Sequence, residues 1–272
     1  MSRKSERRGK GFGFMTRQEN HSPDRSVIIG RNAVAEALRS GRDLDTLFVA
    51  HGSTGAVQAI VAKCVQRGVV VKEVPTTKLD HLSGGGNHQG VVLMAAAHAY
   101  ATVEDMLGLA KERGEEPFLL LCDEIEDPHN LGAIIRTAEA AGAHGVIIPK
   151  RRAATLTSAV AKAACGALEY LPVAKVTNLA AEIDALKARG LWIYGAEMCE
   201  SHWCQTDWTG PVALVIGSEG KGLGRLIRSK CDGLVSMPML GKISSLNASV
   251  AAGVLMYEVA RQRQGISAFT KR

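Results

Sequence analysis

The 272-residue chain is predicted to fold as an α/β protein with a parallel sheet and a second, smaller α/β domain. From Val27 onward, short β-branched runs alternate with helical patterns of about ten residues. Residues 118–122 (FLLLC) are continuously apolar, which is typical of a strand buried on both faces of a parallel sheet. Because such sheets bind ligands at the carboxyl ends of their strands, polar segments that follow strands are candidate sites.

Residues 1–26 are expected to form a disordered basic arm. Its first 25 residues hold seven Lys or Arg against three acidic residues, which accounts for +4 of the net charge of +6. The arm lacks the apolar centre of a secretory signal, and its acidic residues weaken an organelle-targeting interpretation. A flexible cationic arm attracts RNA or DNA through counterion release. A solvated tail that only aids solubility is the alternative.

Residues 27–98 are predicted to form the smaller domain. Helices are expected over 30–40, 56–67 and 78–82, and strands over 45–50, 69–73 and 89–96. A further helical pattern in residues 99–116 marks the linker between the domains.

Residues 117–265 are predicted to form the larger domain, followed by a tail of residues 266–272. Strands are expected over 118–122, 146–148, 170–173, 191–195, 212–216 and 233–237. Helices are expected over 131–141, 157–167, 179–189, 223–230 and 246–263. Repeated strand and helix units of this kind build a parallel sheet between two layers of helices.

The first polar cluster, residues 123–136, follows the strand at 118–122 and opens the next helix. We expect Asn130 to be the N-cap of that helix. Arg136 comes six residues later and is expected to project from nearly the same side. Its helix is otherwise apolar, so we expect a partly buried guanidinium that needs an anionic partner. A simple cap and a solvated arginine are the alternatives.

The second cluster is a glycine-rich turn at 217–224 (GSEGKGLG), directly after the strand at 212–216. It is not the dinucleotide pattern GxGxxG, because Arg225 stands where the third glycine should be, and it is not a GxxxxGK[ST] phosphate loop. The turn displays one carboxylate, Glu219, with main-chain groups that can hold an adenine or a ribose. A plain turn with Glu219 near a helix start is the alternative.

The third cluster, residues 237–249 (MPMLGKISSLNAS), leads into the last helix. Ser244, Ser245, Asn247 and Ser249 are more hydroxyls and amides than one helix cap requires. We interpret the excess as a binding function. The small apolar segment that follows, 250–254 (VAAGV), permits close helix contact and the pairing of subunits.

These clusters resemble a known family. In order and spacing, NLGAIIRTAEAAG (130–142), LVIGSEGKGL (214–223) and MPMLGKISSLNASVAAGV (237–254) resemble the three motifs of the SpoU/TrmH branch of the SPOUT RNA methyltransferases. GRNAVAEAL and NHQGVV in the first half resemble that branch's small RNA-binding domain, which is ribosomal-protein L30e-like. With this appended domain, the chain is most similar to the bacterial 23S rRNA (guanosine-2'-O-)-methyltransferases.

The resemblance implies a fold and an activity. It implies a SPOUT domain tied in a deep trefoil knot, a homodimer formed through that domain, and S-adenosyl-L-methionine-dependent 2'-O-methylation of a ribose in RNA, with a guanosine of 23S rRNA as target. By motif position it implies catalytic or substrate-positioning roles for Asn130, Arg136, Glu219, Ser245 and Asn247. It implies cofactor contacts at Gly217, Met237 and Leu246, with Gly195 and Glu197 as further candidates.

The implied chemistry suits these side chains. Methyl transfer from a sulfonium is an in-line displacement, so the ribose oxygen must be held about 3 to 3.5 Å from the methyl carbon. Fixed donors such as Arg136 stabilise the developing alkoxide charge. A guanidinium stays protonated in proteins, so we expect Arg136 to grip the nucleotide's phosphate, oriented by Glu219 and Asn130, rather than to act as general base.

Other functions stay open at this point. The substrate could be tRNA, or the chain could be an RNA-binding or ribosome-assembly factor without catalysis. A conventional Rossmann methyltransferase is disfavoured, because its glycine loop should follow the first strand of its domain. No metal is expected, since Cys199, His202 and Cys204 lack a second ligand pair.

The expected location is the cytoplasm. No apolar run approaches the roughly 20 residues that cross a bilayer, so no membrane partner is expected. The six cysteines are far apart and contain no CxxC, which fits a reducing compartment.

Overall fold

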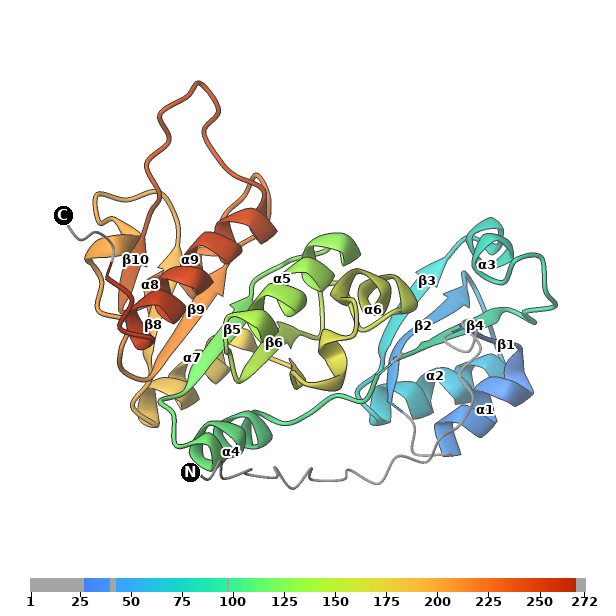
Figure 1. The fold of residues 1–272 in the computed structure, drawn as a ribbon. Coiled ribbons are helices and arrows are strands. Elements are labelled where there is room, and N and C mark those ends of the chain that lie inside the picture. The colour runs from blue at the N-terminus through green and yellow to red at the C-terminus, as the bar shows by residue number, and fades with distance from the viewer. Residues whose placement is uncertain (1–26, 40–42, 97, 268–272) are drawn as a thin grey trace, which may run out of the picture.

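The computed structural model describes residues 27–39, 43–96 and 98–267, which fold around two separate sheets (Figure 1). The basic arm expected at residues 1–26 lies outside the described residues, as does most of the tail expected at 266–272. The part of the chain around the first sheet is called the N-terminal domain below, and the part around the second sheet is called the C-terminal domain.

The N-terminal domain is built on a four-stranded sheet in the order β1-β4-β2-β3. Its strands are β1 (Val27–Ile29), β2 (Leu44–Ala50), β3 (Val70–Val74) and β4 (Val91–Ala95). Its helices are α1 (Arg31–Arg39), α2 (Ala56–Gln66) and α3 (Thr76–Leu82). β2 and β3 are parallel, whereas β4 runs antiparallel to β1 and β2. Leu47 and Leu93 of the sheet and Ile60 of α2 belong to its buried core.

The C-terminal domain is built on a six-stranded parallel sheet in the order β10-β8-β9-β5-β6-β7. The strands are β5 (Phe118–Cys122), β6 (Gly145–Pro149), β7 (Val173–Val176), β8 (Trp192–Ala196), β9 (Val212–Ile216) and β10 (Gly233–Val235). The helices are α4 (Val103–Arg113), α5 (Pro128–Ala140), α6 (Ser158–Ala164), α7 (Leu179–Ala188), α8 (Arg225–Lys230) and α9 (Ala248–Arg263), with short 3-10 helices η1 (Ala167–Glu169) and η2 (Trp203–Gln205).

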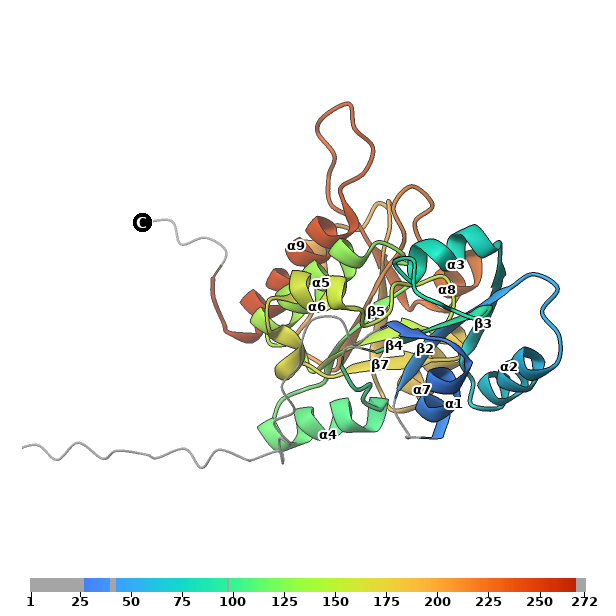
Figure 2. The ribbon, with the colours of Figure 1, turned by 90° about the vertical axis from the view of Figure 1, so that its right-hand side faces the viewer.

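Helices cover both faces of this sheet. α5, α6 and α9 pack on one face (Figure 2), and α4, α7 and α8 pack on the other. Every residue of the central strands β5 and β9 is therefore buried, as the continuous apolar run FLLLC predicts. Among the described helices, none is both long and apolar enough to cross a membrane.

The predicted strand at 170–173 is wrong in position. β7 begins only at Val173, and the side chain of Tyr170 is 72% exposed. Cys165 and Gly166 adopt left-handed conformations with φ of 49° and 89°, which ends α6 at Ala164. The chain then makes η1 and a turn before it enters the sheet, so the strand starts three residues later than its β-branched pattern indicates.

The sheet topology places all three polar clusters at one edge. From β5 the chain moves outward through β6 and β7, and it then returns to build β8, β9 and β10 on the other side of β5. The strand order therefore reverses between β5 and β9, and parallel sheets bind ligands at such a switch point. The segments after β5, β9 and β10 contain the three clusters.

A buried contact joins the two domains. The Asp45 carboxylate of β2 forms an ion pair with Lys175 of β7, and both side chains are at least 92% buried. The Tyr100 hydroxyl donates to Asp45 Oδ1 at 2.8 Å and accepts from the Leu156 amide at 3.0 Å. Lys175 Nζ also lies 4.5 Å from the centre of the Tyr100 ring. Because Lys175 and Tyr100 both bind Asp45 Oδ1, the contact fixes the two domains relative to each other.

Candidate functional site

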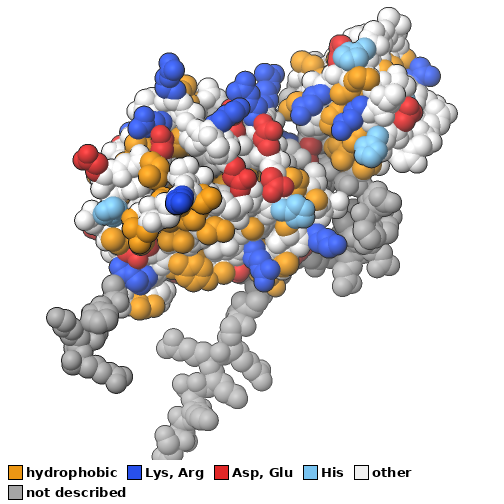
Figure 3. Space-filling view, turned by 90° about the horizontal axis from the view of Figure 1, so that it is seen from above, with side chains coloured by type: hydrophobic (Ala, Val, Ile, Leu, Met, Phe, Trp, Pro, Cys, Tyr) orange, Lys and Arg blue, Asp and Glu red, His pale blue; other side chains and the backbone are white. Residues whose placement is uncertain are grey.

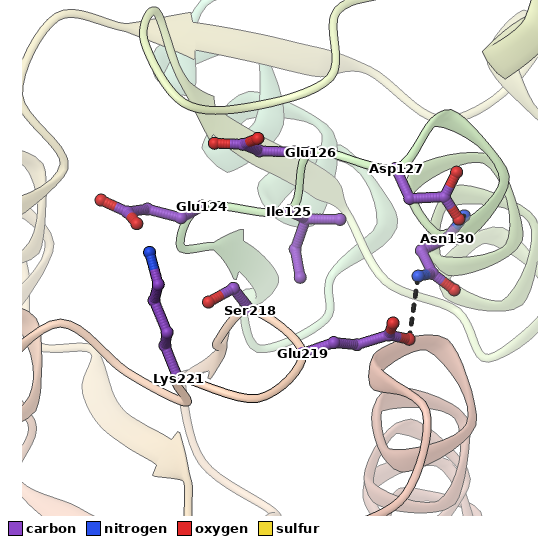
Figure 4. A pocket seen from close by; sticks show the side chains of 8 residues that line it. All are labelled: Glu124, Ile125, Glu126, Asp127, Asn130, Ser218, Glu219 and Lys221. Carbon is purple, nitrogen blue, oxygen red and sulfur yellow. Dashed lines mark hydrogen bonds between the residues drawn. The ribbon is translucent and has the colours of Figure 1, made fainter.

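Asn130, Glu219 and Asn247 come together in one hydrogen-bonded cluster, called the amide-carboxylate cluster below. Asn130 Nδ2 donates to Glu219 Oε1 at 3.0 Å (Figure 4). Asn247 Nδ2 donates to Asn130 Oδ1 at 2.9 Å and also to Glu219 Oε1. The Ala248 amide donates to the same carboxylate oxygen at 3.3 Å. One carboxylate thus ties the starts of α5 and α9 to the turn after β9.

Asn130 reaches the cluster because another residue caps its helix. The Asp127 carboxylate accepts from the amides of His129 and Asn130, each at 3.2 Å, and Pro128 occupies the first helical position. The prediction that Asn130 is the N-cap is therefore wrong. With its helix started three residues earlier, the Asn130 side chain is free to face Glu219, and the residue is only 8% exposed.

The side-chain amide of Asn247 has two tasks. Its oxygen caps α9, and its nitrogen contacts Glu219. Its Oδ1 accepts from the Ser249 amide at 3.0 Å, the Val250 amide at 3.3 Å and the Ser249 hydroxyl at 2.6 Å. These bonds assign the oxygen to the helix and leave Nδ2 facing Glu219. Capping and cluster formation therefore orient the same side chain.

A tight turn after β9 holds Glu219 at its tip. The backbones of Ser218 and Gly222 exchange two hydrogen bonds of 3.1 and 3.0 Å. A Cβ atom at Gly217 would lie 2.3 Å from the carbonyl carbon of Gly222, so only glycine fits there. Gly220 and Gly222 also have φ of 83° and 64°, which glycine adopts without strain. The glycines thus serve the turn that positions the carboxylate.

A cavity of about 270 Å³ lies beside the cluster. Figure 4 shows its lining: Glu124, Ile125, Glu126, Asp127, Asn130, Ser218, Glu219 and Lys221. Lys221 points toward Glu124 across the opening (Figure 4). No function is predicted from the sequence for Glu124, Glu126, Asp127 or Lys221, whereas Glu219 is predicted to be catalytic. The usable signal was their position directly after β5 and β9.

A second cavity, of about 450 Å³, is also lined by Glu219. Four of the predicted cofactor positions line it, namely Gly217, Met237, Leu246 and Glu197, and Ser245 lines it as well. Gly195 does not line it. A Cβ atom there would lie 2.6 Å from Leu223 Cδ1, so Gly195 is packed in the apolar core beneath the cavity.

The second cavity combines apolar walls with free polar groups. Met237, Met239 and Leu246 provide apolar surface, and the glycine turn provides main-chain groups. Glu197 Oε2 is buried and accepts no hydrogen bond from a described residue, although Arg228 Nε lies 3.3 Å away. A buried carboxylate oxygen without a donor suits a ligand that carries hydroxyl or ammonium groups.

Arg136 is not part of the amide-carboxylate cluster within one chain. Its side chain is exposed, and its Nη1 donates to Cys165 Sγ at the end of α6, at 3.4 Å. The predictions that it is partly buried and shares a side with Asn130 are wrong. Six residues turn a helix by about 600°, which is about 120° short of two turns. Asn130 and Glu219 bond each other, not Arg136.

Both domains match known protein families. Residues 117–257 match the SpoU rRNA Methylase family, and residues 27–101 match the family described as RNA 2'-O ribose methyltransferase substrate binding. The chain belongs to the SpoU rRNA methylase family. It is therefore an RNA methyltransferase, and the two cavities that Glu219 lines form the candidate active site of a SpoU enzyme.

Relatives and solved structures agree with this assignment. A Bacillus subtilis protein named as a TrmH family tRNA/rRNA methyltransferase is 50% identical over 247 residues, which cover 90% of this chain and 99% of that relative. A Staphylococcus haemolyticus protein of the same name is 43% identical and covers 88% of this chain and 97% of its own length.

Among solved structures, the SpoU methyltransferase AviRb from Streptomyces viridochromogenes, in complex with AdoMet, is similar with a TM-score of 0.57 and 27% identity. That match covers 88% of this chain and 90% of AviRb. An AdoMet-bound rRNA methyltransferase from Sinorhizobium meliloti is similar with a TM-score of 0.54 and 28% identity, over 87% of this chain and 86% of the other. This SpoU chain thus shares both of its domains with enzymes that have been crystallised.

Proposed function

We propose that the chain transfers a methyl group from S-adenosyl-L-methionine to a ribose 2'-hydroxyl, and that its target is a guanosine of 23S rRNA. One observation carries the proposal: Glu219 lines two cavities and is bonded to Asn130 and Asn247. A methyl donor in one cavity and a nucleoside in the other would meet at this cluster. Such proximity is the main requirement of an in-line displacement.

The larger cavity, called the donor cavity below, is the site for S-adenosyl-L-methionine. Its donor set fits: apolar surface at Met237 and Leu246 for the methionine chain, main-chain groups of the glycine turn for the adenine, and the buried Glu197 oxygen for an amine or a ribose hydroxyl. When bound, the cofactor supplies an electrophilic methyl group on a sulfonium. The AdoMet complexes of two structural neighbours support the choice of this cofactor.

The cluster residues hold the ribose for the transfer. The amides of Asn130 and Asn247 are fixed by Glu219 and by the α9 cap, so their orientation is set before RNA binds. Preorganised polar groups of this kind cost no rearrangement during the reaction. Ser245 lines the larger cavity together with Glu219. Glu219 itself acts chiefly by keeping both amides in place.

The smaller cavity favours guanine as the target base. Its lining holds the carboxylates of Glu124, Glu126 and Asp127, which only accept hydrogen bonds when ionised. Guanine presents adjacent N–H donors on its pairing edge, whereas uracil presents one donor between two acceptors. An acidic cavity is therefore suited to guanosine, the target implied by the resemblance of the sequence to the 23S rRNA (guanosine-2'-O-)-methyltransferases.

A homodimer completes the proposal. Val250, Val254 and Tyr257 of α9 are 52%, 40% and 55% exposed and recur at helical spacing along one stripe. An exposed apolar stripe of this kind indicates a protein interface, and a second copy of the chain can supply a matching stripe. Val254→Glu should convert the dimer to monomers in sedimentation experiments.

The dimer also explains the position of Arg136. Arg136 precedes Thr137, which lies against Gly253 of α9, so it borders the proposed interface. We place the partner subunit's Arg136 at each active site. Mixing Arg136→Ala chains with Asn130→Ala chains should then restore about a quarter of the wild-type activity, because half of the dimers are mixed and each has one complete site. No recovery after subunit exchange would refute this placement.

Mapping of 2'-O-methylation tests the target. Ribosomal RNA and tRNA from cells with and without the protein are compared, and the purified protein is then given the unmethylated RNA with cofactor. We expect one guanosine of 23S rRNA to lose its methyl group in the deleted strain. Loss confined to a tRNA would replace the target, and cofactor binding without any methylated RNA would favour an assembly factor. The deep trefoil knot, the L30e-like fold of the N-terminal domain and a cytoplasmic location stay predictions.

A further inference from the structure

A large groove separates the two domains and is distinct from both active-site cavities. Its volume is about 1140 Å³. One wall comes from Val65 and residues 68–72 of the N-terminal domain, around the edge strand β3. The opposite wall comes from residues 150–153, the loop that follows β6. The groove thus belongs to neither domain alone.

The groove is positively charged. Among its described lining residues, Lys72, Lys150, Arg151 and Arg152 oppose a single carboxylate, Glu126. Figure 3 shows Lys and Arg side chains on both sides of the hollow between the domains. Arg152 is paired with Glu124 at 2.9 Å, whereas Lys72, Lys150 and Arg151 form no ion pair with another described residue. Unneutralised cations on facing walls attract a polyanion.

The walls of the groove are held at a set distance. The contact of Asp45 with Lys175 and Tyr100 fixes the two domains relative to each other. Across the groove, Lys150 Nζ lies only 3.1 Å from where a Cβ of Gly68 would be, so the ammonium group rests against the N-terminal domain. A site that is already formed avoids the free-energy cost of ordering during binding.

The groove also offers apolar surface. The side chain of Val65 is 62% exposed, and the half-buried Val71 lies near it on β3. A nucleic acid strand carries charged phosphates on one side and apolar ring faces on the other. Cations and exposed valines in one groove therefore match both sides of such a strand.

The groove leads to the active site. Glu126 lines both the groove and the smaller cavity beside the amide-carboxylate cluster. The acidic lining of that cavity repels phosphates, so a bound strand would keep its backbone along the cations and present a nucleoside to the cavity. The change from basic groove to acidic cavity thus determines which part of the strand lies in the groove and which part enters the cavity.

We infer that the interdomain groove binds a single-stranded segment of the RNA substrate, with Lys72, Lys150 and Arg151 against its phosphates and Val65 against a base. The inference rests on the proposed function, because it assigns the path by which that substrate reaches the active site. A cube of the groove's volume is about 10 Å on a side. A base-paired helix does not enter such a space, because a duplex is wider than its own major groove, which alone measures ~12 Å in B-form DNA. Unpaired segments are also where side chains reach RNA bases.

Neutralising two groove cations tests the inference. The probe is a fluorescein-labelled, unpaired 20-nucleotide RNA, and its affinity is measured by anisotropy from 0.05 to 0.4 M salt. Each phosphate contact contributes about 0.7 to the salt slope of single-strand binding. The double variant Lys150→Gln, Arg151→Gln should therefore lower the slope by about 1.4 and the affinity by about 25-fold at 0.1 M salt.

The matched control removes the same charge elsewhere. Lys111 and Arg113 are exposed on α4 and do not line the groove, so the variant Lys111→Gln, Arg113→Gln should keep most of the affinity. Equal losses in both variants, or no loss in the groove variant, would overturn the inference. Photo-crosslinking of a 4-thiouridine version of the probe should label peptides that contain residues 65–72 and 150–155, and labelling confined to other peptides would also overturn it.

These measurements separate the groove from the proposed activity. The probe reports binding without any methyl transfer, so a protein that binds it through the groove but methylates no RNA would refute the proposed function alone. Conversely, a groove variant that binds the probe like wild type and methylates RNA normally would refute the groove and leave the activity intact. Cofactor affinity by calorimetry should be unchanged in both variants, because neither substitution touches that cavity.

Discussion

Replacing Asn130 by aspartate tests the amide-carboxylate cluster directly, because it keeps the shape of the side chain and turns a donor into an anion. Asn130 Nδ2 lies 3.0 Å from Glu219 Oε1, so Asn130→Asp brings two carboxylate oxygens to that separation. Two unit charges at 3.0 Å repel by about 1.4 kcal/mol at the dielectric constant of water and by about 5.5 kcal/mol at an effective value of 20. With Asn130 buried and Glu219 exposed, the penalty falls between these limits.

This repulsion should separate α5 from the turn after β9. A displacement of about 1 Å at an active site costs on the order of 100-fold in rate, so we expect kcat of Asn130→Asp to fall about 100-fold at pH 8. As the pH falls, the pair can share one proton, because each carboxylate raises the pKa of the other. The ratio of variant to wild-type activity should therefore rise toward pH 5.5.

The assay is transfer of a tritiated methyl group to RNA from cells that lack the protein, measured from pH 5.5 to 8.5. Asn130→Ala is the matched control, since it loses the same hydrogen bond but adds no charge, and its activity ratio should not vary with pH. Calorimetry should show cofactor affinity within about threefold of wild type in both variants, because the donor cavity is lined largely by other residues. Identical pH profiles for the two variants, or a fully active aspartate variant, would refute the role assigned to this cluster.

Three further predictions address other parts of the structure. Arg136→Ala should abolish methyl transfer without a change in cofactor affinity, because the side chain lies outside the donor cavity; turnover on the natural RNA would contradict its role. Gly132→Ala should lower the free energy of unfolding by about 1 to 3 kcal/mol, since its Cβ would lie 2.4 Å from that of Ala163, whereas Gly108→Ala, with open space around it, should raise that energy by about 0.5 to 1 kcal/mol. Burial lowers the pKa of His144, so the unfolded chain binds that proton more strongly and the free energy of unfolding falls below about pH 6.5; His144→Gln should lose part of this dependence in denaturant titrations.

The sheet and the location of the site could be predicted because both depend on local patterns. A run of five apolar residues at 118–122 identifies a strand with two buried faces, and the structure places it in the centre of the sheet. Polar residues that directly follow buried strands mark the ligand-binding edge of a parallel sheet. Asn130, Glu219 and Asn247 come together by this rule, although they are far apart in the chain.

Three predictions were wrong: the N-cap of α5, the exposure of Arg136 and the start of β7. Asp127 and Asn130 are both good N-caps, and the proline at 128 was the signal that favours Asp127, because proline prefers the first position of a helix. For Arg136, a spacing of six residues is just under two turns, but the remaining angle of about 120° is enough to move a side chain from a buried face to an exposed one. The start of β7 depended on the left-handed conformation of Cys165. A non-glycine residue adopts this conformation at an energetic cost, and no sequence pattern predicts it here.

The capping of α5 by Asp127 shows how this site can be recognised from a sequence. A helix needs one capping side chain, and α5 already has Asp127. Asn130 is then a surplus polar residue on a buried face, and a buried amide must find partners beyond its own helix. Glu219 and Asn247 supply those partners from segments 89 and 117 residues away. The surplus of hydroxyls and amides before α9 follows the same logic: Asn247 alone caps that helix, while Ser244 and Ser245 line the donor cavity. Polar side chains in excess of what a helix start requires are therefore better indicators of the reaction site here than any single charged residue. Arg136, the charged residue expected to stabilise the reaction, lies outside the amide-carboxylate cluster of its own chain.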